Sequence, residues 1–413
     1  MLTLAILGNA RAALAQQIVM QNSSQQFTET YAIPFLNSSF VQEMIVTSNG
    51  KAGDRTRWYG CMNNNYTAWY TNDITFGGDG GDPSGFARTA TGHLVLVALQ
   101  SSANGPQWYW TTDPCPSSGQ PNWFWWHVNT DSTGSVDYTH SAYDPINDQM
   151  AITYTQKVNN NLKRMVVDRI NSNFQGLSTA QWNTCSNIAS HNIQYVNSTF
   201  DSNGTQHIVY LDSTSGQVQY EQYTTSGGFA CINQPLGPYN GPSGSCTGCG
   251  IGTYQGLASN CLKGTWNGTI AANGNNLVVS WSTIGSGGCS QTSETRMYQS
   301  SNLGASWTFA TVTGCQNALQ PRVTVSGGNF HIITSYAPIG TTQLAQVDWK
   351  STDNGLTWSG QYLTGGRSVF PLTGCYWGDY QGATYDPSSR VSFFSWAQVS
   401  GSNWVGEGIL NNP

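Results

Sequence analysis

Two similar short segments in the second half of the chain constrain its fold more than any other feature. The first is Ser351-Thr352-Asp353-Asn354-Gly355-Leu356-Thr357-Trp358, and a weaker copy, Ser300-Ser301-Asn302-Leu303-Gly304-Ala305-Ser306-Trp307, lies about fifty residues upstream. In the pattern S-x-D-x-G-x-T-W, the acid accepts hydrogen bonds within its own turn, the glycine takes a positive φ, and the tryptophan packs on the next strand. A near-repeat at this distance indicates a modular, blade-by-blade architecture.

The pattern resembles the Asp-box, or BNR, repeat of sialidase-like β-propellers. The first copy fills every defining position, with Ser351, Asp353, Gly355, Thr357 and Trp358. The second copy keeps Ser300, Gly304 and Trp307, while Asn302 and Ser306 retain an acceptor and a hydroxyl at the two remaining positions. The resemblance implies that both boxes hold outer hairpins, away from the central face where ligands bind.

Composition favours an all-β chain with a single domain. Of the 413 residues only 9% are charged, whereas 12% are aromatic, and there are 46 glycines and 16 tryptophans. Helical proteins are instead rich in Ala, Leu, Glu and Lys. No Pro-rich or low-complexity linker divides the chain, and closed all-β folds often exceed ordinary domain size. We therefore expect one β-propeller domain over residues 16–413, with an N-terminal segment closing the last blade.

The N-terminus and the cysteines favour export. Leu2 to Leu7 is apolar, and Ala13-Leu14-Ala15 resembles a cleavage site, so residues 1–15 are predicted as a signal peptide and the chain as secreted. Ten cysteines fit as many as five disulfides in an oxidising compartment, and we expect Cys289 to pair with Cys315 across one blade. The pair Cys246-x-x-Cys249 is not completed to four ligands at the spacing of a zinc finger, so neither a metal nor another cofactor is predicted.

Sequons and charge bear on the expected partners. Sequons at Asn22, Asn37, Asn65, Asn197, Asn203 and Asn267 would carry glycans in a eukaryotic secretory pathway. The net charge of −6, with 15 Lys and Arg and no basic run, gives no electrostatic footprint for nucleic acid. No apolar stretch approaches the length that spans a bilayer. We expect a monomer whose partners are extracellular glycans or glycoproteins.

A second repeat, a turn followed by a short apolar strand, predicts the number of blades. Its six copies begin at His93, Gln149, Gln206, Asn276, Phe330 and Arg390, about 55 to 70 residues apart. Such runs suit strands buried on both faces, as the second strand of a blade is. The prediction is a six-bladed β-propeller in which the segment around Thr67-Ala68-Trp69-Tyr70 completes the last blade. The alternative is seven blades, with Gln42 to Asp73 as a blade of its own.

The candidate site lies in the loops that lead into the innermost strands, where the resemblance places the ligands of such propellers. Aromatic rings beside amide and carboxylate groups suit sugars, since the C–H faces of a sugar stack on rings while its hydroxyls find polar partners. The candidate substrate-binding residues are Arg322, His140, Tyr138, Tyr254, Gln255, Trp377, Gln381 and His191. The candidate catalytic residues are Asp379, Tyr380 and Asp137, the two acids acting as paired carboxylates across the axis.

Sialidase activity is not expected. The resemblance implies three arginines that clamp a carboxylate, a tyrosine nucleophile and an acid/base aspartate, but the Arg-Ile-Pro motif of the first arginine is absent from the stretch Gly81 to Arg88. Three functions remain open. Glycan binding through the axial face ranks first, a non-sialidase glycoside hydrolase or lyase using axial Asp, Tyr and His ranks second, and an extracellular protein-interaction or structural propeller ranks third. Whether the chain is an enzyme depends on whether two carboxylates meet in the axial pocket.

Overall fold

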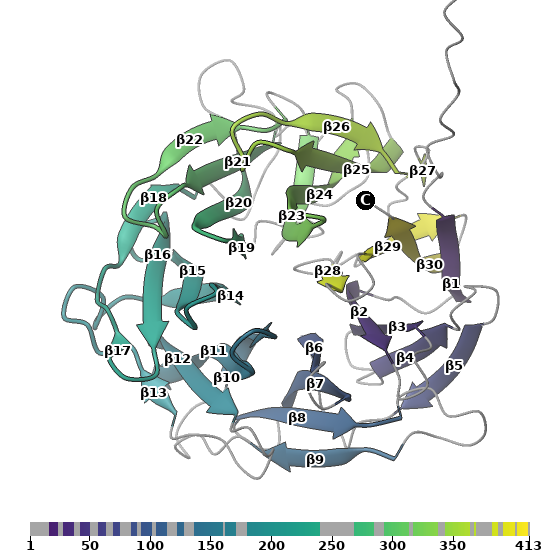
Figure 1. Ribbon diagram of the computed structural model, residues 1–413, viewed down its shortest axis with the longest axis horizontal. Helices are drawn as coiled ribbons and strands as arrows, with labels where there is room; N and C mark the ends of the chain where they lie inside the picture. Colours follow the sequence, from purple (N-terminus) through teal and green to yellow (C-terminus); the bar gives the residue numbers. More distant parts are fainter. Residues whose placement is uncertain are drawn as a thin grey trace, which may run out of the picture.

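The computed structural model describes twenty segments of the chain. These are residues 16–23, 28–36, 42–49, 57–62, 69–74, 84–88, 92–100, 105–113, 122–127, 136–159, 162–170, 180–239, 268–284, 293–313, 317–337, 343–363, 367–368, 382–386, 391–400 and 403–411. Within residues 16–74 and 382–411 the backbone alone is described. All regular structure is β-strand, in antiparallel sheets of four or five strands arranged around a central axis (Figure 1).

Five sheets are described together with most of their side chains. One contains β6 (Ser84–Arg88), β7 (His93–Gln100), β8 (Gly105–Thr111) and β9 (Phe124–His127), and the next contains β10 (Val136–Asp144), β11 (Gln149–Asn159), β12 (Leu162–Ile170) and β13 (Gln181–Trp182). The third contains β14 (Ile193–Phe200), β15 (Gln206–Asp212), β16 (Gln217–Thr224), β17 (Gly228–Phe229) and β18 (Gln234–Pro238). The fourth contains β19 (Thr269–Asn273), β20 (Asn276–Ile284), β21 (Ser293–Ser300) and β22 (Thr308–Thr311). The fifth contains β23 (Asn317–Ser326), β24 (Asn329–Ala337), β25 (Gln343–Ser351), β26 (Ser359–Tyr362) and β27 (Arg367–Ser368).

Two further sheets complete the ring. One contains β2 (Thr28–Leu36), β3 (Gln42–Asn49), β4 (Arg57–Met62) and β5 (Trp69–Ile74). In the other, β28 (Gly382–Asp386), β29 (Val391–Ser400) and β30 (Asn403–Asn411) come from the C-terminal part of the chain, and β1 (Gln16–Ser23) pairs with β30. Pairing of the two ends of the chain removes the free sheet edge that an open ring would leave.

The prediction of six blades is wrong. The sheet β2–β5 adds a unit that the turn-plus-apolar-strand repeat does not mark, because the apolar part of β3 is limited to Met44-Ile45-Val46. The alternative with Gln42 to Asp73 as a separate blade misplaces this sheet, which begins at Thr28. The strand predicted around Thr67 to Tyr70 to complete the last blade is also assigned wrongly, because Trp69 begins β5, which pairs with β4.

The hydrophobic core is divided into layers between neighbouring blades. In the five sheets with described side chains the second strands are largely buried, and β15 is buried over its whole length. Rings fill the spaces between sheets: Trp108 packs with residues of β11 and β12, and Trp281 packs with residues of β15 and β16. Burial of each such ring contributes on the order of 2–3 kcal/mol. The core therefore links each of the five sheets with described side chains to the next.

The two Asp-box segments form the hairpins β21–β22 and β25–β26 near the outer edge of their sheets (Figure 1). In the second hairpin the Thr357 amide donates to Asp353 at 2.8 Å, the Thr357 hydroxyl also donates to this carboxylate, and the Gly355 amide donates to the Ser351 hydroxyl at 2.8 Å. The Thr357 hydroxyl, the Thr357 amide and the Ser351 hydroxyl all donate to Asp353 and lower its pKa to about 2. The first hairpin repeats the arrangement with Asn302 as acceptor for the Ser306 amide at 2.9 Å.

The disulfide that the structure describes joins Cys185 to Cys231, with a Cα–Cα distance of 5.4 Å. It connects the segment before β14 to the segment between β17 and β18. The predicted pair Cys289 and Cys315 lies outside the described residues. Among the residues that are described, no helix is long and apolar enough to cross a membrane.

Candidate axial binding site

A repeated β-bulge shapes the axial end of the innermost strands. In β10, β14 and β23 two residues face a single residue of the neighbouring strand, with register shifts between Asp137 and His140, between Gln194 and Asn197, and between Leu319 and Arg322. The backbone of β2 has the same irregularity between Thr28 and Tyr31. The repetition shows that the bulge is a regular feature of this ring.

The first residue of each bulge in β10, β14 and β23 has a left-handed backbone. Tyr138, Tyr195 and Gln320 have φ angles of 52°, 51° and 51°. A positive φ is an outlier for bulky residues and costs roughly 1–2 kcal/mol in each case. Glycine would adopt this conformation at no cost, yet the chain has tyrosine at two of the three positions. Strain of this kind accumulates at functional sites.

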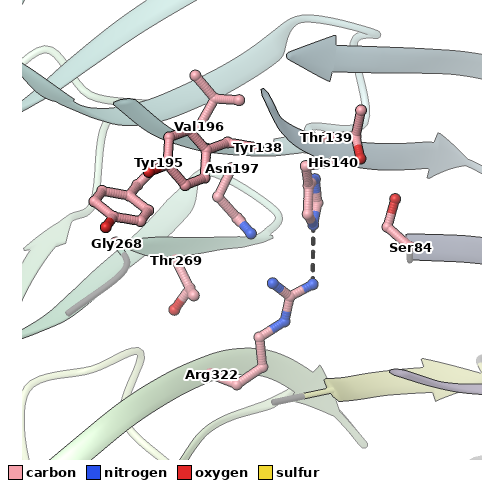
Figure 2. Close-up of a pocket in the computed structure, with 10 residues that line it drawn as sticks. All are labelled: Ser84, Tyr138, Thr139, His140, Tyr195, Val196, Asn197, Gly268, Thr269 and Arg322. Carbon is pink, nitrogen blue, oxygen red and sulfur yellow. Dashed lines mark hydrogen bonds between the residues drawn. The ribbon is translucent and has the colours of Figure 1, made fainter. Parts of the chain in front are cut away.

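The residue two places after each strained position lines one pocket on the axis. His140, Asn197 and Arg322 come from three different inner strands, and Ser84 of β6 and Thr269 of β19 join them. In Figure 2 the side chains of His140, Asn197 and Arg322 point toward one another, and Tyr138 and Tyr195 lie to one side of them. The remaining residues that line this pocket are Thr139, Val196 and Gly268.

A chain of hydrogen bonds shows that these pocket positions are equivalent. At four of the five positions, all except Arg322, the side chain accepts the backbone N–H that follows the pocket residue of the next inner strand. Ser84 accepts from Ser141 at 3.0 Å, and His140 Nδ1 accepts from Ser198 at 3.3 Å. Asn197 accepts from Ile270 at 3.2 Å, and Thr269 accepts from Val323 at 3.1 Å. The pocket residues therefore also tie the inner strands to one another.

Arg322 and His140 meet across the axis. A guanidinium nitrogen of Arg322 lies 2.9 Å from His140 Nε2, and both side chains are buried (Figure 2). Burial, followed by the charge of Arg322, lowers the pKa of His140 well below its ordinary value. The imidazole is therefore neutral at physiological pH.

A neutral imidazole has one acceptor nitrogen and one N–H, and both ring nitrogens of His140 face a donor. Only one of the two contacts is therefore a hydrogen bond at a time. The repeated pattern of Ser84, Asn197 and Thr269 favours Nδ1 as the acceptor, whereas the shorter contact at 2.9 Å is a hydrogen bond only with the lone pair on Nε2, because arginine has no acceptor. The first arrangement places the proton on Nε2. In that tautomer the His140 and Arg322 N–H groups converge, and such a pair of donors suits an acceptor from a ligand.

The opposite end of the pocket is aromatic. The rings of Tyr138 and Tyr195 lie with their centroids 4.2 Å apart, tilted by 47°. In Figure 2 the Asn197 side chain lies between these rings and the His140–Arg322 pair. The pocket thus joins a ring surface to a cluster of polar donors, which is the combination that sugar recognition uses.

The structure brings together three of the predicted site residues, namely Tyr138, His140 and Arg322. Asp137 is adjacent, but its carboxylate forms an ion pair with Lys163 at 2.6 Å and does not line the pocket. His191 lies apart, with Nδ1 at 2.7 Å from the buried Asp212 carboxylate. The predictions for Tyr254, Gln255, Trp377, Asp379, Tyr380 and Gln381 fall outside the described residues.

Several pocket residues are not indicated by the sequence. Ser84 and Thr269 carry no chemical signature, and Asn197 belongs to a sequon. Its side chain is 5% exposed and bonded to Ile270, so the inner strand has no room for a glycan at this position. Among the described residues no group of three or more His, Cys, Asp or Glu side chains gathers in a way that would hold a metal ion. The described lining of the pocket also contains no carboxylate.

Comparison with known proteins extends the description of the fold. No protein-family model matches the chain, and no curated protein sequence matches it. Among solved structures, the polysaccharide lyase Uly1 is similar with a TM-score of 0.56 at 10% identity, over 90% of this chain and 88% of that one. The phage phi92 endosialidase has a TM-score of 0.51 at 7% identity, and the match covers 97% of this chain and 69% of that one. The Penicillium chrysogenum alpha-L-arabinanase has a TM-score of 0.49 at 10% identity, and the match covers 96% of this chain and 98% of that one. At these identities the likeness concerns the fold, and the chain has the fold of the sialidase-like β-propellers.

Proposed function

We propose that this chain is a carbohydrate-binding propeller that takes an acidic sugar in its axial pocket. The observation that carries the proposal is the convergence of donors from Arg322 and the neutral His140 at one end of a pocket whose other end is aromatic. A carboxylate matches the planar fork of an arginine, and hydrogen bonds of this charge-assisted kind are among the strongest in proteins. The rings of Tyr138 and Tyr195 supply a surface for the C–H face of the sugar.

Fold similarity adds limited support. The names of the similar structures describe a polysaccharide lyase and an endosialidase, both of which act on carbohydrates. A fold does not determine an activity, so the proposed function depends mainly on the residues of the pocket. Its described lining offers donors and rings but no carboxylate pair, which is the arrangement that most glycoside hydrolases need. Binding is therefore preferred over hydrolysis.

The test compares two sugars that differ only in the acid group. Calorimetric titration with galacturonate and with galactose is expected to show at least about tenfold tighter binding of the acid, the equivalent of 1.4 kcal/mol. Arg322→Gln is expected to remove this preference, because the amide cannot pair with a carboxylate as a guanidinium does. Arg164→Gln removes one positive charge outside the pocket and serves as the control. Equal affinity for the two sugars in the native protein would contradict the proposal.

A second candidate is an elimination reaction on a uronate. The 2.9 Å contact favours it, because as a hydrogen bond that contact requires a free lone pair on His140 Nε2 facing Arg322. Arg322 would neutralise the uronate carboxylate, and Nε2 would take the proton from C5. The electrons of that C–H bond form the C4–C5 double bond, the C4–O bond breaks, and the leaving oxygen takes a proton from water or from a tyrosine hydroxyl.

This candidate depends on the tautomer opposite to the one that the repeated hydrogen bonds favour. If it is right, incubation with polyuronates produces the ultraviolet absorbance of an unsaturated uronate, and His140→Gln abolishes that product while Tyr143→Phe, outside the pocket, does not. Absence of the product in the native protein, combined with tight binding of the acid, would reject elimination and leave the binding function standing.

A further inference from the structure

The hairpin between β11 and β12 carries an unusual concentration of positive charge. Lys157, Lys163 and Arg164 are three of only 15 Lys and Arg residues, in a chain of net charge −6. Lys157 and Lys163 lie directly opposite each other in the antiparallel pair. Like charges at such a position destabilise a sheet, so this arrangement is not explained by the stability of the hairpin.

The hairpin reaches beyond the inner strand at the end of β10 that carries the bulge. Val136, the first residue of β10, pairs with Gln156, so Lys157 and the residues up to Asn159 extend past the start of β10. The bulge that holds Tyr138 and His140 lies at this same end of β10. The charged hairpin is thus next to the end of β10 whose residues Tyr138 and His140 line the pocket.

Lys163 connects the hairpin to the aromatic end of the pocket. Its Nζ lies 2.6 Å from a carboxylate oxygen of Asp137 and 4.9 Å from the centre of the Tyr138 ring. Since neighbouring residues of a strand face opposite sides, Arg164 is directed elsewhere, and its guanidinium lies 5.6 Å from the ring of Trp182. Among the described residues no carboxylate pairs with Lys157. Lys163 therefore lies beside a ring that lines the pocket, and Lys157 lies opposite it on the same face of the hairpin. Of the two, Lys163 has a carboxylate partner among the described residues.

We infer that Lys157 and Lys163 form a second subsite for the acid groups of sugar residues adjoining the one in the pocket. This inference rests on the proposed function and narrows the ligand class to a polyanionic polysaccharide, in place of a single acidic sugar. A chain that leaves the pocket over Tyr138 brings its next acid group toward the two ammonium groups. Lysine, as a compact charge on a flexible stem, accepts carboxylates and sulfates without strict geometry, so the subsite selects charge and spacing.

The test measures affinity against ligand length. Calorimetric titrations with galacturonate and with its oligomers of increasing length are expected to show an affinity that rises once the ligand spans both subsites. Sulfated oligomers of equal length distinguish sulfate from carboxylate as the preferred group. Lys157→Gln is expected to reduce the ratio of oligomer affinity to monomer affinity about fivefold and to weaken the salt dependence of oligomer binding. Lys157→Gln keeps the ion pair between Lys163 and Asp137, so the Tyr138 end of the pocket is retained.

Arg164→Gln is the matched control, since it removes the same charge from the opposite face of the same hairpin. It is expected to leave the ratio of oligomer affinity to monomer affinity as it is in the native protein. An affinity that does not rise with length, or a ratio that Lys157→Gln leaves unchanged, overturns the second subsite while the Arg322 result stands. If the native protein binds none of these ligands, the proposed function itself fails.

Discussion

The two ring nitrogens of His140 have different roles. Its Nδ1 faces the Ser198 amide and belongs to the repeated set of bonds that joins the inner strands, while its Nε2 faces Arg322 at the axis. Burial, which removes water, and the positive charge of Arg322 both disfavour protonation of the His140 imidazole. The sequence predicts His140 and Arg322 as site residues separately, but their contact spans 182 positions of the chain and depends on closure of the ring.

The lowered pKa of His140 predicts a pH-dependent stability. Below pH 6.5, its ordinary value, the unfolded chain binds a proton at this position while the folded chain does not, so stability falls as the pH decreases through this range. The loss approaches about 1.4 kcal/mol per pH unit for one proton. Denaturant titrations at about pH 7.5 and pH 5.5 check this, with His140→Gln expected to reduce the difference. The same substitution at His93, which lies against the Trp110 ring, is the control. A difference that persists in full without His140 would contradict the assignment.

At the scale of the element, the Asp-box hairpins act between blades as well as within their own turns. Gly304 has φ +87°, and a Cβ at this position would lie within contact distance of the Tyr220 ring of the preceding sheet. Gly355, with φ +91°, occupies the corresponding position against Val278 and Gln299. The Tyr220 hydroxyl also donates to the Leu303 carbonyl at 3.1 Å. Each box therefore holds a glycine because a neighbouring blade approaches its backbone closely.

This contact predicts different costs for two glycine substitutions. Gly274 lies in the β19–β20 turn with φ +57°, and a Cβ added there would meet no atom within 4 Å. Gly274→Ala therefore carries the conformational cost alone, about 1–2 kcal/mol. Gly304→Ala adds the clash with Tyr220 and is expected to destabilise the protein by about a further 1 kcal/mol or more, on the order of an overpacked core site. The midpoints of denaturant unfolding compare the two variants. Equal losses would show that the box does not brace the neighbouring blade.

The Asp boxes can be predicted from the sequence because each depends on a few residues close together in the chain. The bulges cannot, since a bulge is a property of the register between two strands. Tyr138, Tyr195 and Gln320 have the left-handed backbone that glycine normally signals, and their side chains give no indication of it. The sequence therefore indicates Tyr138, His140 and Arg322, which the structure places on inner strands at one pocket and not in loops, but it does not indicate Ser84, Asn197 and Thr269.

At the scale of the whole molecule, the ring brings residues from distant parts of the chain to one axis. The number of blades cannot be read from the apolar repeat, because the sheet β2–β5 has a weaker second strand and β1 joins the C-terminal sheet. All-β composition and modular architecture are predictable, since they depend on residue usage and on short repeats. Closure of the ring depends on pairing between the ends of the chain, which no local pattern encodes.

We expect the axis of this propeller to receive an acidic sugar through Arg322 and His140. A crystal structure of the protein with a bound galacturonate oligomer tests it most directly. We predict a carboxylate within hydrogen-bond distance of the Arg322 guanidinium and of His140 Nε2, with the sugar ring against Tyr138 and Tyr195. An oligomer bound elsewhere, or one in the pocket with its carboxylate directed away from Arg322, would contradict this claim.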